Sequence, residues 1–190
     1  MFFTAKIAHE IIGVLKMLFN DYVWVKGKPR GKSPILPQDA SNGTSYKIVK
    51  DPYGKRISIE RLERGIFQDI IYDSNLFDFR VLIAKFESSW QKINHDKGTL
   101  IRDHDDRTIA EEFYVFEKGL CTECRIHYPK GPLVAIQKMI YGKENNLIAM
   151  VLYDVLDHPA GLKMVDAKAV CTFESWDMAD KTVQEKLKII

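Results

Sequence analysis

Residues 108–153 decide the fold: TIAEEFYVFEKGLCTECRIHYPKGPLVAIQKMIYGKENNLIAMVLY. Apolar and aromatic runs alternate here with short turns that contain glycine, proline or asparagine. Turns this short join neighbouring antiparallel strands. The stretch therefore predicts a meander with strands at Thr108–Glu117, Leu120–Tyr128, Leu133–Tyr141 and Leu147–Tyr153. The last of these is apolar on both faces, which favours a central position in the sheet.

The same alternation extends outward, from about Ser45 to Phe173. It predicts further strands at 46–50, 57–61, 66–72, 76–83 and 162–173. Residues 82–93 favour a short helix, because Leu82, Phe86 and Trp90 recur at helical spacing. Residues 94–107 are predicted to be a polar connection between the two halves of the sheet.

The two ends of the chain have different patterns. Residues 4–22 predict an amphipathic helix capped by Thr4, with Lys6 and Glu10 on its wetter side. Residues 26–45 contain three prolines and three glycines, which favours a long flexible loop. Residues 177–190 predict a short C-terminal helix with Asp177 and Asp180 as a capping pair.

Together these elements predict an α+β fold that is mainly antiparallel β, in a single domain over residues 1–190. A sheet of roughly nine to ten strands has long edges, and closing it into a barrel removes them. We therefore expect a barrel or a strongly curved meander sheet, with a helix at each end. A barrel of this size can enclose a small ligand.

The composition excludes several classes of protein. A net charge of +2 in 190 residues does not indicate dedicated nucleic-acid binding. Three cysteines are too few for a disulfide framework, so we expect a cytoplasmic protein. No apolar run is long enough for a membrane helix, and the N-terminus lacks the basic region of a signal peptide. Nucleotide-hydrolase, Rossmann, hydrolase-elbow and zincin motifs are missing from the sequence.

The first chemical lead is a group of sulfur and imidazole ligands. Cys121, Cys124, His127 and Cys171 have the residue types of a tetrahedral zinc site. Within a strand, however, Cys121 and Cys124 point to opposite faces unless a bulge intervenes. Unrelated thiols are therefore the favoured interpretation, and neither a metal nor any other cofactor is predicted.

The second lead is acid–base chemistry. His104 lies beside Asp103 and Asp106 in a polar stretch, and histidine titrates near neutral pH. His158 follows Asp154 and Asp157 in a turn that would lie at the rim of a barrel. His104, Asp106 and His158 are thus candidate catalytic residues, although solvated turns are the favoured interpretation of both groups.

The third lead is a basic stretch of Lys26, Lys28, Arg30 and Lys32. Such cations can contact phosphates through charge alone. Tyr22, Trp24 and Tyr46 are nearby aromatic residues on which bases can stack. A solvated loop is the favoured interpretation, and no dedicated nucleic-acid binding is predicted.

We expect a binding protein that holds a small apolar or aromatic ligand, or that presents a face to a protein partner. Seven aromatic residues are candidates to line the concave interior: Phe67, Tyr72, Phe79, Phe113, Phe116, Tyr128 and Tyr153. A small-molecule enzyme with a His/Asp site in the same barrel is one alternative. A protein–protein interaction module is another, and exposed apolar area on one face would be its sign.

Overall fold

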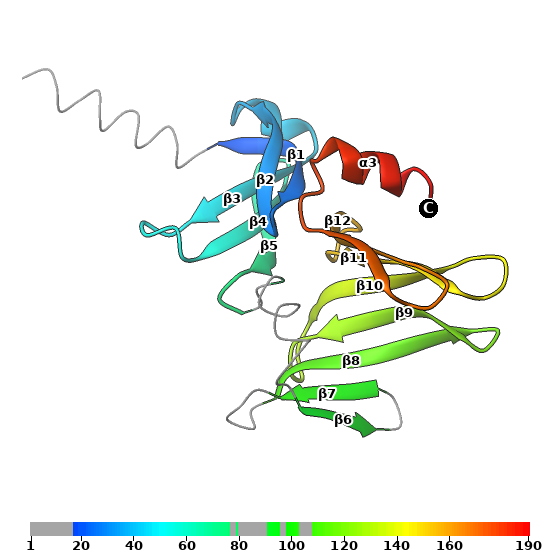
Figure 1. Cartoon of the computed structure of the whole chain (residues 1–190). Helices are drawn as coiled ribbons and strands as arrows, with labels where there is room; N and C mark the ends of the chain where they lie inside the picture. Colours follow the sequence, from blue (N-terminus) through cyan, green and yellow to red (C-terminus); the bar gives the residue numbers. More distant parts are fainter. Residues whose placement is uncertain (1–16, 77–78, 80–90, 96–97, 103–107) are drawn as a thin grey trace, which may run out of the picture. The chain divides into compact units, whose positions relative to one another are not determined.

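The computed structural model describes residues 17–76, 79, 91–95, 98–102 and 108–190. The chain divides into two compact units. The first unit contains the residues up to Val23 together with Pro29–Asn75, and the second contains Trp24–Lys28 and Leu76–Ile190. Each unit is built around one antiparallel sheet, and Figure 1 shows the strands of each sheet side by side.

The first sheet has five strands in the order β2-β1-β3-β4-β5. The strands are β1 (Leu18–Val25), β2 (Lys28–Ile35), β3 (Thr44–Lys50), β4 (Ile57–Glu63) and β5 (Ile66–Asp73). A short 3-10 helix, η1 (Asp39–Asn42), precedes β3. The core of this unit includes Ile57, Ile59 and Tyr72, which are buried, and Tyr22, whose ring meets that of Tyr46 edge-on.

The turn between β3 and β4 is closed by its first residue. Asp51 accepts hydrogen bonds from the Gly54 N–H on its carbonyl, at 2.9 Å, and from the Lys55 N–H on its carboxylate, at 2.6 Å. Gly54 has a φ of +65°, a conformation that glycine adopts without steric cost.

The second sheet has eight strands, in the order β13-β12-β11-β10-β9-β8-β7-β6. They are β6 (Gln91–His95), β7 (Gly98–Arg102), β8 (Thr108–Glu117), β9 (Leu120–His127), β10 (Leu133–Tyr141), β11 (Leu147–Tyr153), β12 (Pro159–Val165) and β13 (Cys171–Ser175). Every neighbour in this sheet is also the next strand in the chain, so the sheet is a plain meander.

A compact core in the second unit forms around Trp24. Trp24, Phe79, Met178 and Val183 are all fully buried, and the rings of Trp24 and Phe79 lie 4.8 Å apart. The Met178 N–H donates to the Trp24 carbonyl at 3.0 Å. Val183 lies on the C-terminal helix α3 (Lys181–Leu187), whose first turn is capped by the Asp180 side chain.

Much of the sequence-based prediction is confirmed. The chain is mainly antiparallel β with a short C-terminal helix. Strands β8, β10 and β11 have the predicted bounds. None of the helices among the described residues is long and apolar enough to cross a membrane.

The predicted barrel is wrong for the described part of the chain, where both sheets are open. Closure needs a hydrogen-bonded pair between the two outermost strands, and these are β2 and β5 in one sheet and β13 and β6 in the other. Strand β2 carries Pro29 and Pro34, which have no N–H to donate, and this suits it to an edge rather than to a closing seam.

Several element boundaries also differ. The helix predicted over 4–22 cannot extend past residue 17, because Leu18–Val25 forms β1; its earlier residues lie outside the described part. The loop predicted over 26–45 contains β2 and η1, because an edge strand tolerates proline. The predicted strand at 162–173 is two strands joined by a turn at Asp166–Ala169, where Ala169 has a φ of +59°.

Three predictions fall wholly or partly on residues that are not described. Of the strand predicted at 76–83, Leu76 lies in a turn and Phe79 is helical. Of the helix predicted at 82–93, residues 91–93 belong to β6. The polar connection predicted at 94–107 contains strand β7.

Candidate interaction surface

A bulge in strand β9 places two cysteines on the same face of the second sheet. Tyr114 lies opposite Cys124, and Phe116 lies opposite Cys121, because the register shifts between Val115 and Phe116. The shift leaves Thr122 as an extra residue on β9. Residues directly opposite each other share a face, so both cysteines project with Tyr114 and Phe116.

The same face continues across β10 and β11. Cys124 lies opposite Gln137, and alternation along β10 then places Met139 and Tyr141 on this face as well. Met139 lies opposite Met150 on β11. We call the resulting group the apolar patch: Tyr114, Phe116, Cys121, Met139, Tyr141 and Met150.

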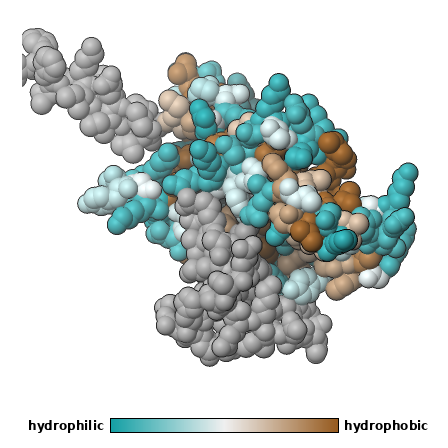
Figure 2. All heavy atoms as spheres, viewed as in Figure 1, coloured by the Kyte–Doolittle hydropathy of each residue, from teal (hydrophilic) through white to brown (hydrophobic). Residues whose placement is uncertain are grey.

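The apolar patch is open to solvent. Phe116 is 63% exposed and Tyr114 is 36% exposed, while the other four side chains are half-buried. The same face is buried toward the other end of these strands, where Cys124, Ile126 and Ala135 are at most 2% exposed, so the open part is the end that carries Phe116 and Tyr114. Brown areas in Figure 2 mark apolar residues that reach the surface.

Hydrogen bonds hold the inner part of the apolar patch in place. The Tyr141 hydroxyl donates to the Cys121 carbonyl at 2.9 Å, which ties β10 to β9 across one end of the sheet. The Gln137 amide donates to the Met150 sulfur at 3.6 Å. Partial burial raises the pKa of both the Tyr141 hydroxyl and the Cys121 thiol above their ordinary values. Both groups are therefore neutral at physiological pH.

The residues of the predicted zinc site do not converge. His127 lies opposite Glu111, on the other face of the sheet from Cys121 and Cys124. Cys171 is exposed on the edge strand β13. Within the described ranges, no three His, Cys, Asp or Glu side chains are grouped so that they could hold a metal ion.

The three cysteines are expected to react with iodoacetamide in a fixed order. Cys171 is exposed and should react first. Cys121 should be slower, because burial raises its thiol pKa and so lowers its thiolate fraction, and the buried Cys124 should be slowest. Peptide mapping by mass spectrometry at pH 8 measures the order, with denatured protein as the control. Fastest labelling at Cys121 would contradict the assigned burial and favour a reactive thiol.

Of the candidate acid–base residues, the structure describes only His158. Asp154 is 2% exposed, and its carboxylate accepts hydrogen bonds from the backbone N–H of Leu156 and of His158. The same carboxylate accepts a hydrogen bond from the Trp24 indole at 2.9 Å, and the His158 ring nitrogen lies 3.5 Å away. This Asp154 cluster stabilises a turn and the buried indole. His104 and Asp106 lie outside the described residues.

The seven aromatic residues predicted to line one interior are dispersed. Phe67 and Tyr72 belong to the first unit, where Phe67 is exposed and Tyr72 is buried. The other five belong to the second unit, at different sites: Phe79 in the Trp24 core, Phe116 in the apolar patch, Tyr128 at the end of β9, and Phe113 and Tyr153 in one row on the opposite face.

Of the apolar patch, Phe116 and Cys121 were candidate site residues from the sequence, whereas four others were not: Tyr114, Met139, Tyr141 and Met150. The missing information was the register of the β10–β11 hairpin, which sets Met139 opposite Met150. The tight turn at Gly142–Asn146 accounts for the pairing of Tyr141 with Leu147, but a register shift between Ile140 and Tyr141 then sets Met139 opposite Met150 rather than Ala149. Neither this irregularity nor the bulge that brings Cys121 into the apolar patch has a signal in the sequence.

No protein-family model matches this chain, and neither does any curated protein. Two solved structures of TarM are similar in part. One is an S. aureus TarM variant in complex with fondaparinux, α-GlcNAc-glycerol and UDP, at 15% identity and a TM-score of 0.23 over 62% of this chain. The other TarM structure has 16% identity and the same TM-score. The matches span 28% of the TarM chain, and a likeness this slight assigns neither a fold nor a function.

Proposed function

We propose that this chain is a protein–protein interaction module, and that the apolar patch is its docking surface. The observation that supports this is the exposure of Phe116 and Tyr114, at 63% and 36%, beside two half-buried methionines on the same sheet face. Aromatic residues and methionine are enriched at the centres of protein interfaces. Methionine also adapts its shape to different apolar surfaces.

The partner that fits this surface is an amphipathic helix. The apolar patch extends over strands β8 to β11, and three inter-strand spacings of about 4.8 Å make it about 14 Å wide. A helix with its side chains is about 10–12 Å in diameter, so one helix covers the patch. A helix on a sheet face is also one of the stable two-layer arrangements.

Site-specific photo-crosslinking tests this function. A photo-reactive phenylalanine analogue at Phe116 is compared with the same analogue at Tyr53, which is 84% exposed on the β3–β4 turn and serves as the matched aromatic control. In cells that express the chain naturally, we expect a crosslink from position 116 to a single partner segment, which mass spectrometry locates on the apolar stripe of a helix. The control position should not give this crosslink.

A charge introduced into the apolar patch should weaken the interaction. Met139→Glu places a carboxylate where the helix would bury apolar area, and we expect the yield of the position-116 crosslink to fall about tenfold. Lys143→Glu, in the exposed turn after β10, is the control and should leave the yield unchanged. Equal crosslinking from positions 116 and 53, or a yield unaffected by Met139→Glu, would overturn the proposal.

A further inference from the structure

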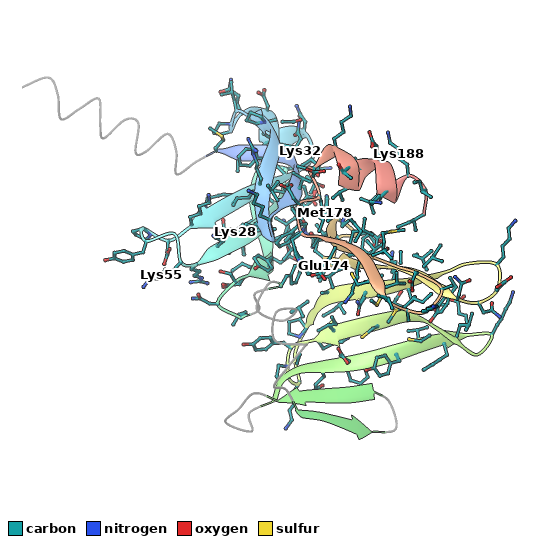
Figure 3. The ribbon with its side chains drawn as sticks, viewed as in Figure 1. Lys28, Lys32, Lys55, Glu174, Met178 and Lys188 are labelled. Atoms are coloured by element: carbon teal, nitrogen blue, oxygen red, sulfur yellow. The ribbon has the colours of Figure 1, made fainter. Side chains whose placement is uncertain are left out.

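Strand β2 presents a row of cations along its solvent side. Burial alternates from Lys28 to Lys32, so that the three cations are exposed while Pro29 is buried. Gly31, between Arg30 and Lys32, packs against the Phe19 ring, and a Cβ there would lie within 2.4 Å of that ring. We call Lys28, Arg30 and Lys32 the basic row, and Figure 3 labels Lys28 and Lys32 on β2.

The edge that carries the basic row is unsuited to strand pairing. Strand β2 is the outermost strand of its sheet, and Pro29 and Pro34 remove two of its N–H donors. Proline and lysine on an edge strand are devices that prevent another strand from adding. The row therefore faces solvent along an edge that a polar or charged ligand can still approach.

From this arrangement we propose that the basic row binds a linear polyphosphate chain through charge alone. Alternate residues of a strand lie about 6.7 Å apart, so the three cations form a regular array along one line. A polyanion can follow that line and place successive phosphates against successive cations. An Asp21 oxygen lies 3.8 Å from the Lys32 ammonium, but both side chains are about half exposed, so this ion pair is weak.

The aromatic residues predicted beside the basic row, Tyr22, Trp24 and Tyr46, are not placed to stack on bases, which limits the ligand chemistry. Of the aromatic residues that the sequence offered as stacking platforms, Tyr22 is 1% exposed and Trp24 is fully buried. Tyr46 is half-buried with its ring against that of Tyr22. Recognition therefore involves the phosphates rather than the bases, and inorganic polyphosphate and single-stranded DNA should compete for the same row.

Fluorescence anisotropy with a labelled oligo-dT tests the proposal, with inorganic polyphosphate as competitor. We expect a plot of log affinity against log salt concentration to have a slope of about −2, because each of three phosphate contacts contributes about −0.7. Replacing Lys28, Arg30 and Lys32 with alanine should weaken binding about tenfold or more at low salt and flatten the slope. The control replaces Lys143, Lys168 and Lys181, three exposed lysines elsewhere, and removes the same charge.

The possible outcomes separate specific binding from general electrostatics. If only the variant that lacks Lys28, Arg30 and Lys32 loses binding, and polyphosphate competes with oligo-dT, the basic row is the binding site. Equal loss in both variants would overturn it, because net charge would then explain the affinity. Absence of binding by the unaltered protein at low salt would overturn it too, as would binding of oligo-dT that polyphosphate does not displace.

Discussion

Replacing Asp154 with asparagine is expected to lower the free energy of unfolding by about 1.5 to 3 kcal/mol, the range measured for hydrogen bonds to charged groups. The Asp154 carboxylate is almost fully buried and accepts hydrogen bonds from the Trp24 indole and from two backbone N–H groups in its own turn. An asparagine amide has one acceptor oxygen and directs an NH₂ group at donors that need an acceptor. At least one buried N–H would then lose its partner.

Asp157→Asn is the matched control, because it makes the same chemical change three residues away. Asp157 is exposed, and its ion pair with Lys138 is near the surface. Its φ of +62° is one that asparagine tolerates. We expect the control to cost less than about 1 kcal/mol. Urea denaturation measures both variants, and hydrogen exchange at the Leu156 and His158 amides reports on the turn itself. Equal effects from the two substitutions would show that Asp154 is not buried as described.

The Asp154 cluster also shows how the sequence misleads about function. An Asp-x-x-Asp-His sequence in a turn suggested acid–base chemistry, because a sequence cannot show which donors surround a carboxylate. In the structure, the Asp154 oxygens accept hydrogen bonds from groups that build the turn and anchor Trp24, a partner 130 residues away in the chain. Nothing in a local pattern predicts a hydrogen bond between residues so far apart.

Strand positions were predictable where local signals agreed. The bounds of β8, β10 and β11 followed from alternation between turn residues. At Lys118 and Gly119 the chain adopts positive φ values of 50° and 82°, which suit a tight hairpin turn. Such turns also fix strand order locally, and this is why the meander in the second sheet was correct.

Sheet closure was not predictable, because it depends on pairing between strands far apart in sequence. The first sheet shows the difficulty: the two-residue turn at Lys26 and Gly27, with φ values of 51° and 69°, joins β1 to β2, but no turn indicates that β1 also pairs with β3. The prolines of β2 were interpreted as loop residues, although an edge strand accommodates them. Distinguishing an edge strand from a loop needs the rest of the sheet.

The candidate surface depends on register more than on composition. Cys121 and Cys124 would lie on opposite faces of a regular strand, and only the extra residue Thr122 brings them together. The same bulge moves Cys121 away from the face of His127 and places it beside Phe116 instead. The predicted metal ligands are therefore divided between the two faces with or without the bulge, and the bulge decides which of them joins the apolar surface.

Replacing Ile59 with alanine is expected to destabilise the protein by about 2 to 5 kcal/mol. Ile59 is fully buried on the interior strand β4, opposite Ile48 on β3 and Tyr72 on β5. Its removal leaves a cavity in the middle of the first sheet, and neighbouring backbones held by cross-strand hydrogen bonds cannot collapse into it.

Ile66→Ala is the matched control, because it removes the same atoms from the neighbouring strand β5. The two variants therefore differ in the burial of the isoleucine and not in the residue type. Ile66 is 68% exposed on the edge strand β5, so its loss should change the free energy of unfolding by less than about 0.5 kcal/mol. Denaturant unfolding with unchanged m-values measures the difference. In a closed barrel β5 would have partners on both sides, and Ile66 would lie beside a second strand rather than at a free edge. Comparable losses from the two substitutions would therefore contradict the open sheet.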